Sequence, residues 1–288
     1  MLVATCISGS APRSLGLGCV GNTIFERLIL PLNSDIFVSV NSYTKKDFNK
    51  TNEIFKNLFT TYNIKPKLFD IYMYNKSYTE AEKCVDKNRA QIGRPQTNGL
   101  VRCYRSIINQ DIRYDWIIRT RTDVYISFVL SSLPQPYIMN NYVVVGFVGA
   151  PTCGSPVAKW IDDKFALLPY GKAQKAYMLK YAQDFCKQPR CSGPTCQAPE
   201  CKIGWTLGSR GLKTLDLRLI GRMYNVSTYM SIIRKNCNET NNAWTNCWKN
   251  KPLHVNSTSI EALMLGNFSR FVKGHKFPMN MNKITLNN

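Results

Sequence analysis

Two different spacings of apolar residues alternate along the first half of the chain. Short apolar runs bounded by small or polar residues predict buried strands. Between these runs, apolar residues recur every three or four positions, which is typical of one face of a helix. The strands are expected at 2–8, 35–40, 67–73, 116–118 and 142–148, and the helical spacing falls at 48–62 and 100–108. Strands separated by helices predict a mainly parallel sheet covered on both faces.

The second half is less regular. Apolar residues at helical spacing predict a helix over 173–185, and the stretch 205–224 predicts a helix end, a glycine turn and a strand. Thr258 and Glu261 fit a capping box that starts a short helix ending near Gly266. The simplest interpretation is a single α/β domain with an elaborated C-terminal half.

The net charge of the chain indicates which classes of partner it favours. Its 38 basic and 18 acidic residues give a net charge of +20, while 44% hydrophobic residues exclude a disordered chain. Such a charge favours anionic partners, namely nucleic acids, phosphorylated small molecules or acidic membranes, although a generally basic, solvated surface would look the same.

Cysteine is the next unusual feature, with 11 residues. Cys186, Cys191, Cys196 and Cys201 follow one another at equal spacing in a proline-containing segment, with four residues in every gap. A zinc site, disulfides (including some to Cys237 or Cys247) and free thiols all remain open. We interpret 186–201 as a Cys-rich insertion without a catalytic role.

No apolar segment is long enough to suggest a membrane span, and the N-terminal apolar run, 2–7, is too short for a signal peptide. The sequence therefore predicts a soluble, cytoplasmic protein.

The most informative stretch is YDWIIRTRTDVYI, residues 114–126. On a strand, Arg119 and Arg121 share one face with Asp123 next in the series. Buried charges without a partner are costly, so the run needs either an ion-pair ladder or an external ligand. Two cations and a carboxylate at a strand end suit a nucleoside diphosphate, with the carboxylate holding a divalent cation.

A second strand end supports the same interpretation. After the first strand comes SGSAPR, in which Ser8 and Gly9 let backbone N–H groups approach a ligand and Arg13 is able to pair with a phosphate. Neither G-x-G-x-x-G nor a P-loop is present, which argues against dinucleotide enzymes and P-loop NTPases.

These segments carry a resemblance. YDWIIRTRTDVYI resembles the Y-D-x-I-x-R-x-R-x-D strand end of a group of GT-A-type nucleotide-sugar glycosyltransferases. VATCISGSAPR, SDIFVSVNS, WIDDKFALLPYGKAQKAYM and APECKIGWTLGSRGLK are similar to further segments of that group, in the same order over residues 1–222. The acidic pair in the third of these is expected to precede an apolar turn and a helix. The overall pattern is similar to the soluble transferases encoded by large algal DNA viruses (chloroviruses), including xylosyltransferases.

The resemblance implies a GT-A-like (Rossmann-like) fold, with residues 1–150 as the nucleotide-sugar-binding half and residues 151–288 as the acceptor-binding half. It implies that Ser8, Gly9, Arg13, Arg119, Arg121 and Asp123 bind the nucleotide sugar. Asp163, Glu200 and Asp162, in that order of preference, are the candidates for the catalytic base.

The resemblance also implies Mn²⁺ or Mg²⁺, held by Asp123 and completed by His275. Many enzymes of this type carry Asp-x-Asp, whereas here Tyr125 stands in the second position. A surface role for His275 is the simpler alternative.

The resulting hypothesis is an inverting, metal-assisted transfer of a sugar from a UDP-sugar, with UDP-xylose as one candidate, to a hydroxyl of a glycan or glycoprotein, in the host cytoplasm if the protein is viral. The main alternative is a basic nucleic-acid-binding protein with a zinc-stabilised Cys cluster, although no interleaved basic and aromatic signature supports it. A nucleotidyltransferase is a second alternative, and it would release pyrophosphate instead of a nucleoside diphosphate.

Overall fold

The computed structural model describes residues 1–12, 15, 20–73, 87–149, 159–184, 199–223, 231–232 and 252–266. Arg13, His275 and three of the clustered cysteines (Cys186, Cys191 and Cys196) lie outside these ranges.

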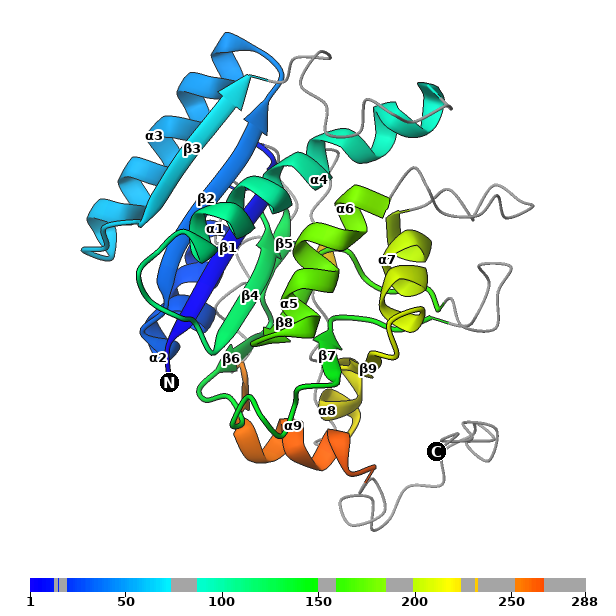
Figure 1. The fold of residues 1–288 in the computed structure, drawn as a ribbon. Coiled ribbons are helices and arrows are strands. Elements are labelled where there is room, and N and C mark those ends of the chain that lie inside the picture. The colour runs from blue at the N-terminus through cyan, green and yellow to red at the C-terminus, as the bar shows by residue number, and fades with distance from the viewer. Residues whose placement is uncertain are drawn as a thin grey trace.

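The centre of the fold is a seven-stranded sheet (Figure 1). Its strand order is β3-β2-β1-β4-β8-β7-β9, and only β8 runs antiparallel to its neighbours. The strands are β1 (Val3–Ser10), β2 (Asp35–Ser42), β3 (Leu68–Met73), β4 (Trp116–Arg121), β7 (Tyr142–Val145), β8 (Phe165–Pro169) and β9 (Lys213–Asp216). Strands from both halves of the chain therefore share one sheet.

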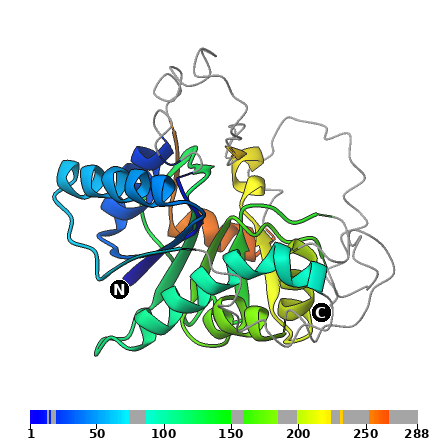
Figure 2. The ribbon, with the colours of Figure 1, turned by 90° about the horizontal axis from the view of Figure 1, so that it is seen from above.

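Helices cover both faces of this sheet, as the view from above shows (Figure 2). One face packs on α1 (Val20–Ile24), η1 (Phe25–Ile29), α3 (Lys45–Thr61) and α9 (Ser257–Met264), which meet Ile7 and Ile118 in one apolar core. The other face packs on α4 (Lys87–Ile108), η2 (Ala176–Lys180) and α7 (Pro199–Gly208), which meet Ala4 and Ile117 in a second core. Burial on both faces explains why the central strands read as continuous apolar runs.

Shorter elements complete the fold. The helices α2 (Leu30–Leu32), α5 (Lys172–Lys175), α6 (Tyr181–Asp184) and α8 (Arg218–Met223) extend or follow the longer ones. The strands β5 (Val124–Tyr125) and β10 (Ser231–Ile232) form an antiparallel pair, and β6 (Phe128–Leu130) and β11 (Leu253–Val255) form a parallel pair.

The predicted α/β architecture, with a mainly parallel sheet flanked by helices, is confirmed. The apolar segment after the acidic pair was expected to be a turn, and this is wrong: it is strand β8. The helical stretch from Val20 to Leu32 was not predicted. Its buried residues lie on nearly all sides of the helix, so the sequence shows no single apolar face at helical spacing. The last helix is capped by Asn256 instead of Thr258, with the Asn256 side chain accepting a hydrogen bond from the Ser259 N–H at 2.9 Å.

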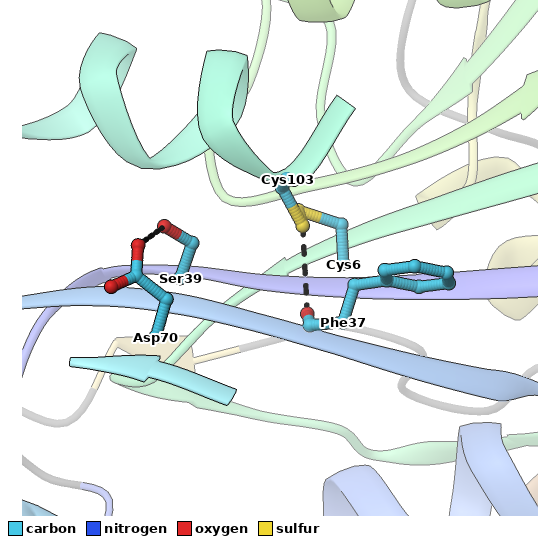
Figure 3. Close-up of a disulfide and its surroundings, with 5 residues drawn as sticks. All are labelled: Cys6, Phe37, Ser39, Asp70 and Cys103. Atoms are coloured by element: carbon cyan, nitrogen blue, oxygen red, sulfur yellow. Dashed lines mark hydrogen bonds between the residues drawn. A yellow bond between two sulfur atoms is a disulfide. The ribbon is translucent and has the colours of Figure 1, made fainter. Parts of the chain in front are cut away.

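A disulfide between Cys6 and Cys103 connects β1 to α4 (Figure 3). Both cysteines are fully buried, and the Cys103 sulfur contacts the carbonyl oxygen of Phe37 on β2 at 3.5 Å. Cys201, in the first turns of α7, is also part of a disulfide. Of the interpretations left open for the Cys cluster, the disulfide holds for Cys201, whose sulfur is therefore not a thiolate ligand for zinc.

Candidate active site

The carboxyl ends of β1, β2 and β4 meet at one edge of the sheet. Ser8 lies opposite Arg121 across β1 and β4, and Ser10 lies opposite Asn41 across β1 and β2. Ligands of open α/β sheets bind beyond such strand ends. The structure therefore brings the two strand-end segments singled out in the sequence next to each other.

The backbone at this edge leaves little room for side chains. Gly9 has φ +132, a conformation that favours glycine, and a Cβ atom there would lie 3.8 Å from Cγ of Arg121. On α4, a Cβ atom at Gly99 would lie 2.8 Å from the Ser39 carbonyl oxygen and 3.3 Å from Cβ of Ser8. Glycine at position 99 lets α4 approach the strand ends closely, whereas glycine at position 9 permits the positive φ.

Arg121 is the centre of the site, because it joins two carboxylates that come from different segments. Its Nε and Nη2 donate hydrogen bonds to Oδ1 and Oδ2 of Asp123 at 2.8 and 2.6 Å. Its Nη1 donates to Oδ2 of Asp163 at 2.9 Å. Arg121, Asp123 and Asp163, which we call the Arg121 cluster, are all buried.

The antiparallel strand β8 explains how Asp163 reaches Arg121. Thr120, near the end of β4, lies opposite Phe165, the first residue of β8. The acidic pair that precedes β8 is therefore delivered to the edge where β4 ends. A parallel β8 would have placed the pair at the far end of the sheet.

The Arg121 guanidinium keeps its positive charge. Burial lowers the pKa of the Arg121 guanidinium, but the neighbouring Asp163 and Asp123 carboxylates outweigh this effect and raise the pKa above its ordinary value. Arg121 is therefore a permanent cation at the strand edge.

Arg119 lies on the same face of β4 as Arg121 and is buried more deeply. Its side chain is only 1% exposed, on the face of the sheet that packs on η2 and α6, and within the described part of the chain its Nε and Nη1 have no hydrogen-bond partner. Its charge acts on Asp162, Tyr177 and Tyr181, as the pKa shifts of these three groups show. Arg119 thus supplies positive charge beneath the acidic pair.

Asp162 and Glu200 lie beside the Arg121 cluster. Asp162 is buried and forms an ion pair with Nζ of Lys164 at 3.2 Å. Burial raises the pKa of Asp162, an effect that Lys164 opposes and Asp163 reinforces. Burial and the charge of Asp163 likewise raise the pKa of Glu200.

Glu200 reaches this place because α7 begins there. The Glu200 carbonyl oxygen accepts a hydrogen bond from the Ile161 N–H at 3.2 Å, which connects α7 to the segment just before the acidic pair. Gly204, one turn further along α7, permits this approach, since a Cβ atom there would overlap the Lys159 carbonyl oxygen at 1.8 Å. Glu200 is only partly buried, unlike Asp162 and Asp163.

Asp123, the expected metal ligand that lies in the described part of the chain, is bound by Arg121 in this arrangement. Both carboxylate oxygens of Asp123 accept hydrogen bonds from Arg121, and the carboxylate is 3% exposed. Tyr125, at the second position of the expected acidic motif, accepts a hydrogen bond on its hydroxyl from Nη1 of Arg27 at 3.1 Å. Within the described ranges no group of three His, Cys, Asp or Glu side chains is arranged to hold a metal ion.

Sequence reasoning missed several residues that shape the site. Thr122 Oγ1 donates to the Ser10 carbonyl oxygen at 2.7 Å, and Ser10 Oγ donates to Oδ1 of Asn41 at 3.2 Å. Arg27 and Lys164 pair with site residues from η1 and from the segment before β8. Small polar residues at strand ends were a usable signal for Ser10 and Asn41, whereas no local pattern marks Arg27.

Comparisons with known proteins place this chain in no family. No family model matches it. No curated protein matches it either. Among solved structures, a protein from Bacillus anthracis named as a glucose-1-phosphate thymidylyltransferase, in complex with sucrose, is similar with a TM-score of 0.43 and 10% identity, covering 85% of this chain and 93% of that chain. A likeness this weak does not bear on the function.

In the ranges that the structure describes, no helix is both long enough and apolar enough to cross a bilayer.

Proposed function

We propose that this protein is a glycosyltransferase that moves a sugar from a nucleoside-diphosphate sugar to a hydroxyl of a glycan or glycoprotein. The observation that carries the proposal is the position of the Arg121 cluster: a permanent cation held between two carboxylates, at the carboxyl ends of parallel strands. The net charge of +20 favours an anionic donor of this kind.

The donor is proposed to lie against the ends of β1, β2 and β4. Ser8 Oγ and Asn41 Nδ2 are buried there, and within the described residues neither has a hydrogen-bond partner. Gly9 keeps this edge free of a Cβ atom. The resemblance seen in the sequence favours UDP-sugars, UDP-xylose among them, with residues 1–150 binding the donor and residues 151–288 the acceptor.

Glu200 is the candidate base that the structure favours. Asp163 was the first choice from the sequence, but its carboxylate is bound to Arg121, and Asp162 is bound to Lys164. Glu200 is the more exposed acid and has a raised pKa, which brings it closer to the neutral range where a general base works best.

The proposed step conserves atoms and charge. The acceptor oxygen attacks C1 of the sugar while the bond from C1 to the diphosphate oxygen breaks. The electron pair of that bond stays on the leaving diphosphate, and the proton of the acceptor hydroxyl passes to the Glu200 carboxylate. A single attack opposite the leaving group inverts the anomeric configuration.

The nucleic-acid alternative loses part of its basis, since Cys201 forms a disulfide and so does not provide a zinc thiolate. The experiment that tests the proposal is a thermal-shift panel of UDP, GDP, UDP-xylose and UDP-glucose. A ligand that binds only the folded state at about 100 times its Kd adds about 2.7 kcal/mol of stability, which is easily measured. Product analysis separates glycosyl transfer, which releases a nucleoside diphosphate, from nucleotidyl transfer, which releases pyrophosphate. Absence of a shift with every nucleotide would remove the basis of the proposal.

A further inference from the structure

We infer that Arg121, and not a divalent metal ion, is the cation that contacts the diphosphate, and that Asp123 serves to hold Arg121 in place. This inference rests on the proposed function and adds that donor binding is independent of Mn²⁺ and Mg²⁺.

The first argument comes from the carboxylate of Asp123. A metal ligand needs an oxygen lone pair directed at the ion, yet Oδ1 and Oδ2 of Asp123 both accept short hydrogen bonds from Arg121, at 2.8 and 2.6 Å. A two-point pair between guanidinium and carboxylate is among the strongest hydrogen-bonded ion pairs in proteins. A metal ion at Asp123 would have to displace this pair or bind through the remaining lone pairs of a side chain that is only 4% exposed.

The second argument comes from the neighbouring acids. Asp163, the other carboxylate of the Arg121 cluster, is bound to Nη1 of the same arginine at 2.9 Å. Asp162 is bound to Lys164 at 3.2 Å. In place of a second acid two residues after Asp123, the chain carries Tyr125, which is neutral and accepts a hydrogen bond from Arg27. Of the described residues that would join Asp123 in coordination, Asp163 and Asp162 are therefore paired with basic side chains, and Tyr125 stands in place of a further acid.

The third argument is the donor capacity that Arg121 keeps. A guanidinium group has five N–H hydrogens, and the hydrogen bonds to Asp123 and Asp163 use three of them. One hydrogen remains on Nη1 and one on Nη2. The Arg121 side chain is 10% exposed, whereas that of Asp123 is 4% exposed, so Arg121 is the more accessible of the two. Two N–H groups on one guanidinium match two oxygens of a phosphate.

The charge that develops on the leaving diphosphate would then be stabilised by a guanidinium that is already oriented. Asp123 and Asp163 fix its plane from two sides, so little reorganisation is needed as the bond breaks. The raised pKa of Arg121 agrees with this role, because the cation persists at any working pH.

The test is calorimetric titration of UDP, and separately of GDP, into the full chain in buffer with EDTA and in buffer with Mn²⁺. We expect the Kd of the better nucleotide to differ by less than about threefold between the two buffers, a difference well below the tenfold that 1.4 kcal/mol produces. Arg121→Lys should weaken binding about tenfold or more, since lysine lacks the planar fork.

Two further variants keep the test decisive. Asp123→Asn should still bind in EDTA, because the amide oxygen continues to accept from Arg121. The matched control is Arg218→Lys, which alters a two-point ion pair of the same spacing, with Asp216, in which neither residue belongs to the Arg121 cluster. It should leave the Kd unchanged, and circular dichroism checks that each variant is folded.

The outcomes separate the two claims. Binding that requires Mn²⁺, and that Asp123→Asn abolishes, would overturn the inference and leave the proposed function standing. Failure of both nucleotides to bind in either buffer would overturn the proposed function itself.

Discussion

Arg121 and Asp123 form a two-point ion pair although only Thr122 separates them in the chain, and the same guanidinium also binds Asp163, 42 residues away. The pair is therefore both a local strand-end feature and the connection between two distant segments. Because all of these side chains are buried, removing either partner would leave a buried charge uncompensated.

Replacing Arg121 should destabilise the protein. Arg121→Met leaves two buried carboxylates without their cation, and breaking a buried pair in this way costs about 3–5 kcal/mol. Urea denaturation measures the loss. Adding Asp123→Asn to Arg121→Met should recover part of it, because one of the uncompensated charges is then removed. A loss below about 1 kcal/mol, typical of exposed pairs, would mean that the cluster is open to water.

Replacing Glu200 should remove catalysis without unfolding the protein. Glu200→Gln keeps the shape of the side chain but takes no proton, so we expect kcat to fall about 10²–10⁴-fold while nucleotide binding persists. Glu53→Gln, on the exposed side of α3, is the control. If Asp163→Asn lowers kcat by the same factor and Glu200→Gln does not, the base is Asp163.

The stability of the same variant should depend on pH in a defined direction. Burial raises the pKa of Glu200 above its ordinary value of 4.5, so the folded state binds a proton more readily than the unfolded state. The stability that this group contributes is complete below pH 4.5 and is lost as the pH rises through the raised pKa. The melting temperature of Glu200→Gln relative to the native protein should therefore increase between pH 4.5 and 7. A relative melting temperature that decreases with pH would contradict this sign.

Removing the disulfide between β1 and α4 should cost stability and leave the site chemistry intact. Loss of a native disulfide typically costs about 2–5 kcal/mol. The double variant Cys6→Ala/Cys103→Ala is expected to show this loss in urea denaturation. A reductant also breaks the disulfide of Cys201, so the loss that it causes in the native protein should exceed the loss that it causes in the double variant by this amount.

Disturbing the close packing of α7 should lower the activity more than it disturbs the rest of the fold. Gly204→Ala places a Cβ atom 1.8 Å from the Lys159 carbonyl oxygen, so α7 must move, and Glu200 moves with it. Overpacking of this kind costs about 1–3 kcal/mol or more. Gly211→Ala is the control, since its φ of +66 strains the backbone but its Cβ atom meets nothing within 4 Å. Activity should fall in the first variant and persist in the second.

The sequence predicted the parallel strands well because apolar runs and strand burial coincide. The predicted strands at 2–8 and 35–40 correspond to β1 and β2, which extend only two residues further at their carboxyl ends. The polar residues that end these strands, Ser10 and Asn41, were left out because they interrupt the apolar pattern that defines a buried strand.

The direction of β8 could not be predicted from apolar patterns. Its five apolar residues fit a turn, a buried helix segment or a strand equally well, and no local feature sets the direction in which a strand runs. The contact of Asp163 with Arg121 depends entirely on that direction, so it was not predictable from spacing.

The pairing of Cys6 with Cys103 could not be predicted from the sequence for a similar reason. Cys6 and Cys103 are 97 residues apart, and neither stands in a recognisable motif. The regular spacing of Cys186, Cys191, Cys196 and Cys201 drew attention to a different part of the chain. Connectivity follows from the packing of α4 on β1, which only the folded structure reveals.

The bond between Cys6 and Cys103 also closes a covalent ring that contains β2, α3 and β3. A protease that cuts the backbone once inside this ring would leave the two fragments attached to each other. The nicked protein would keep its mass, apart from one added water, until a reductant separates the fragments, so intact-mass spectrometry with and without reduction would reveal cuts that ordinary size analysis overlooks.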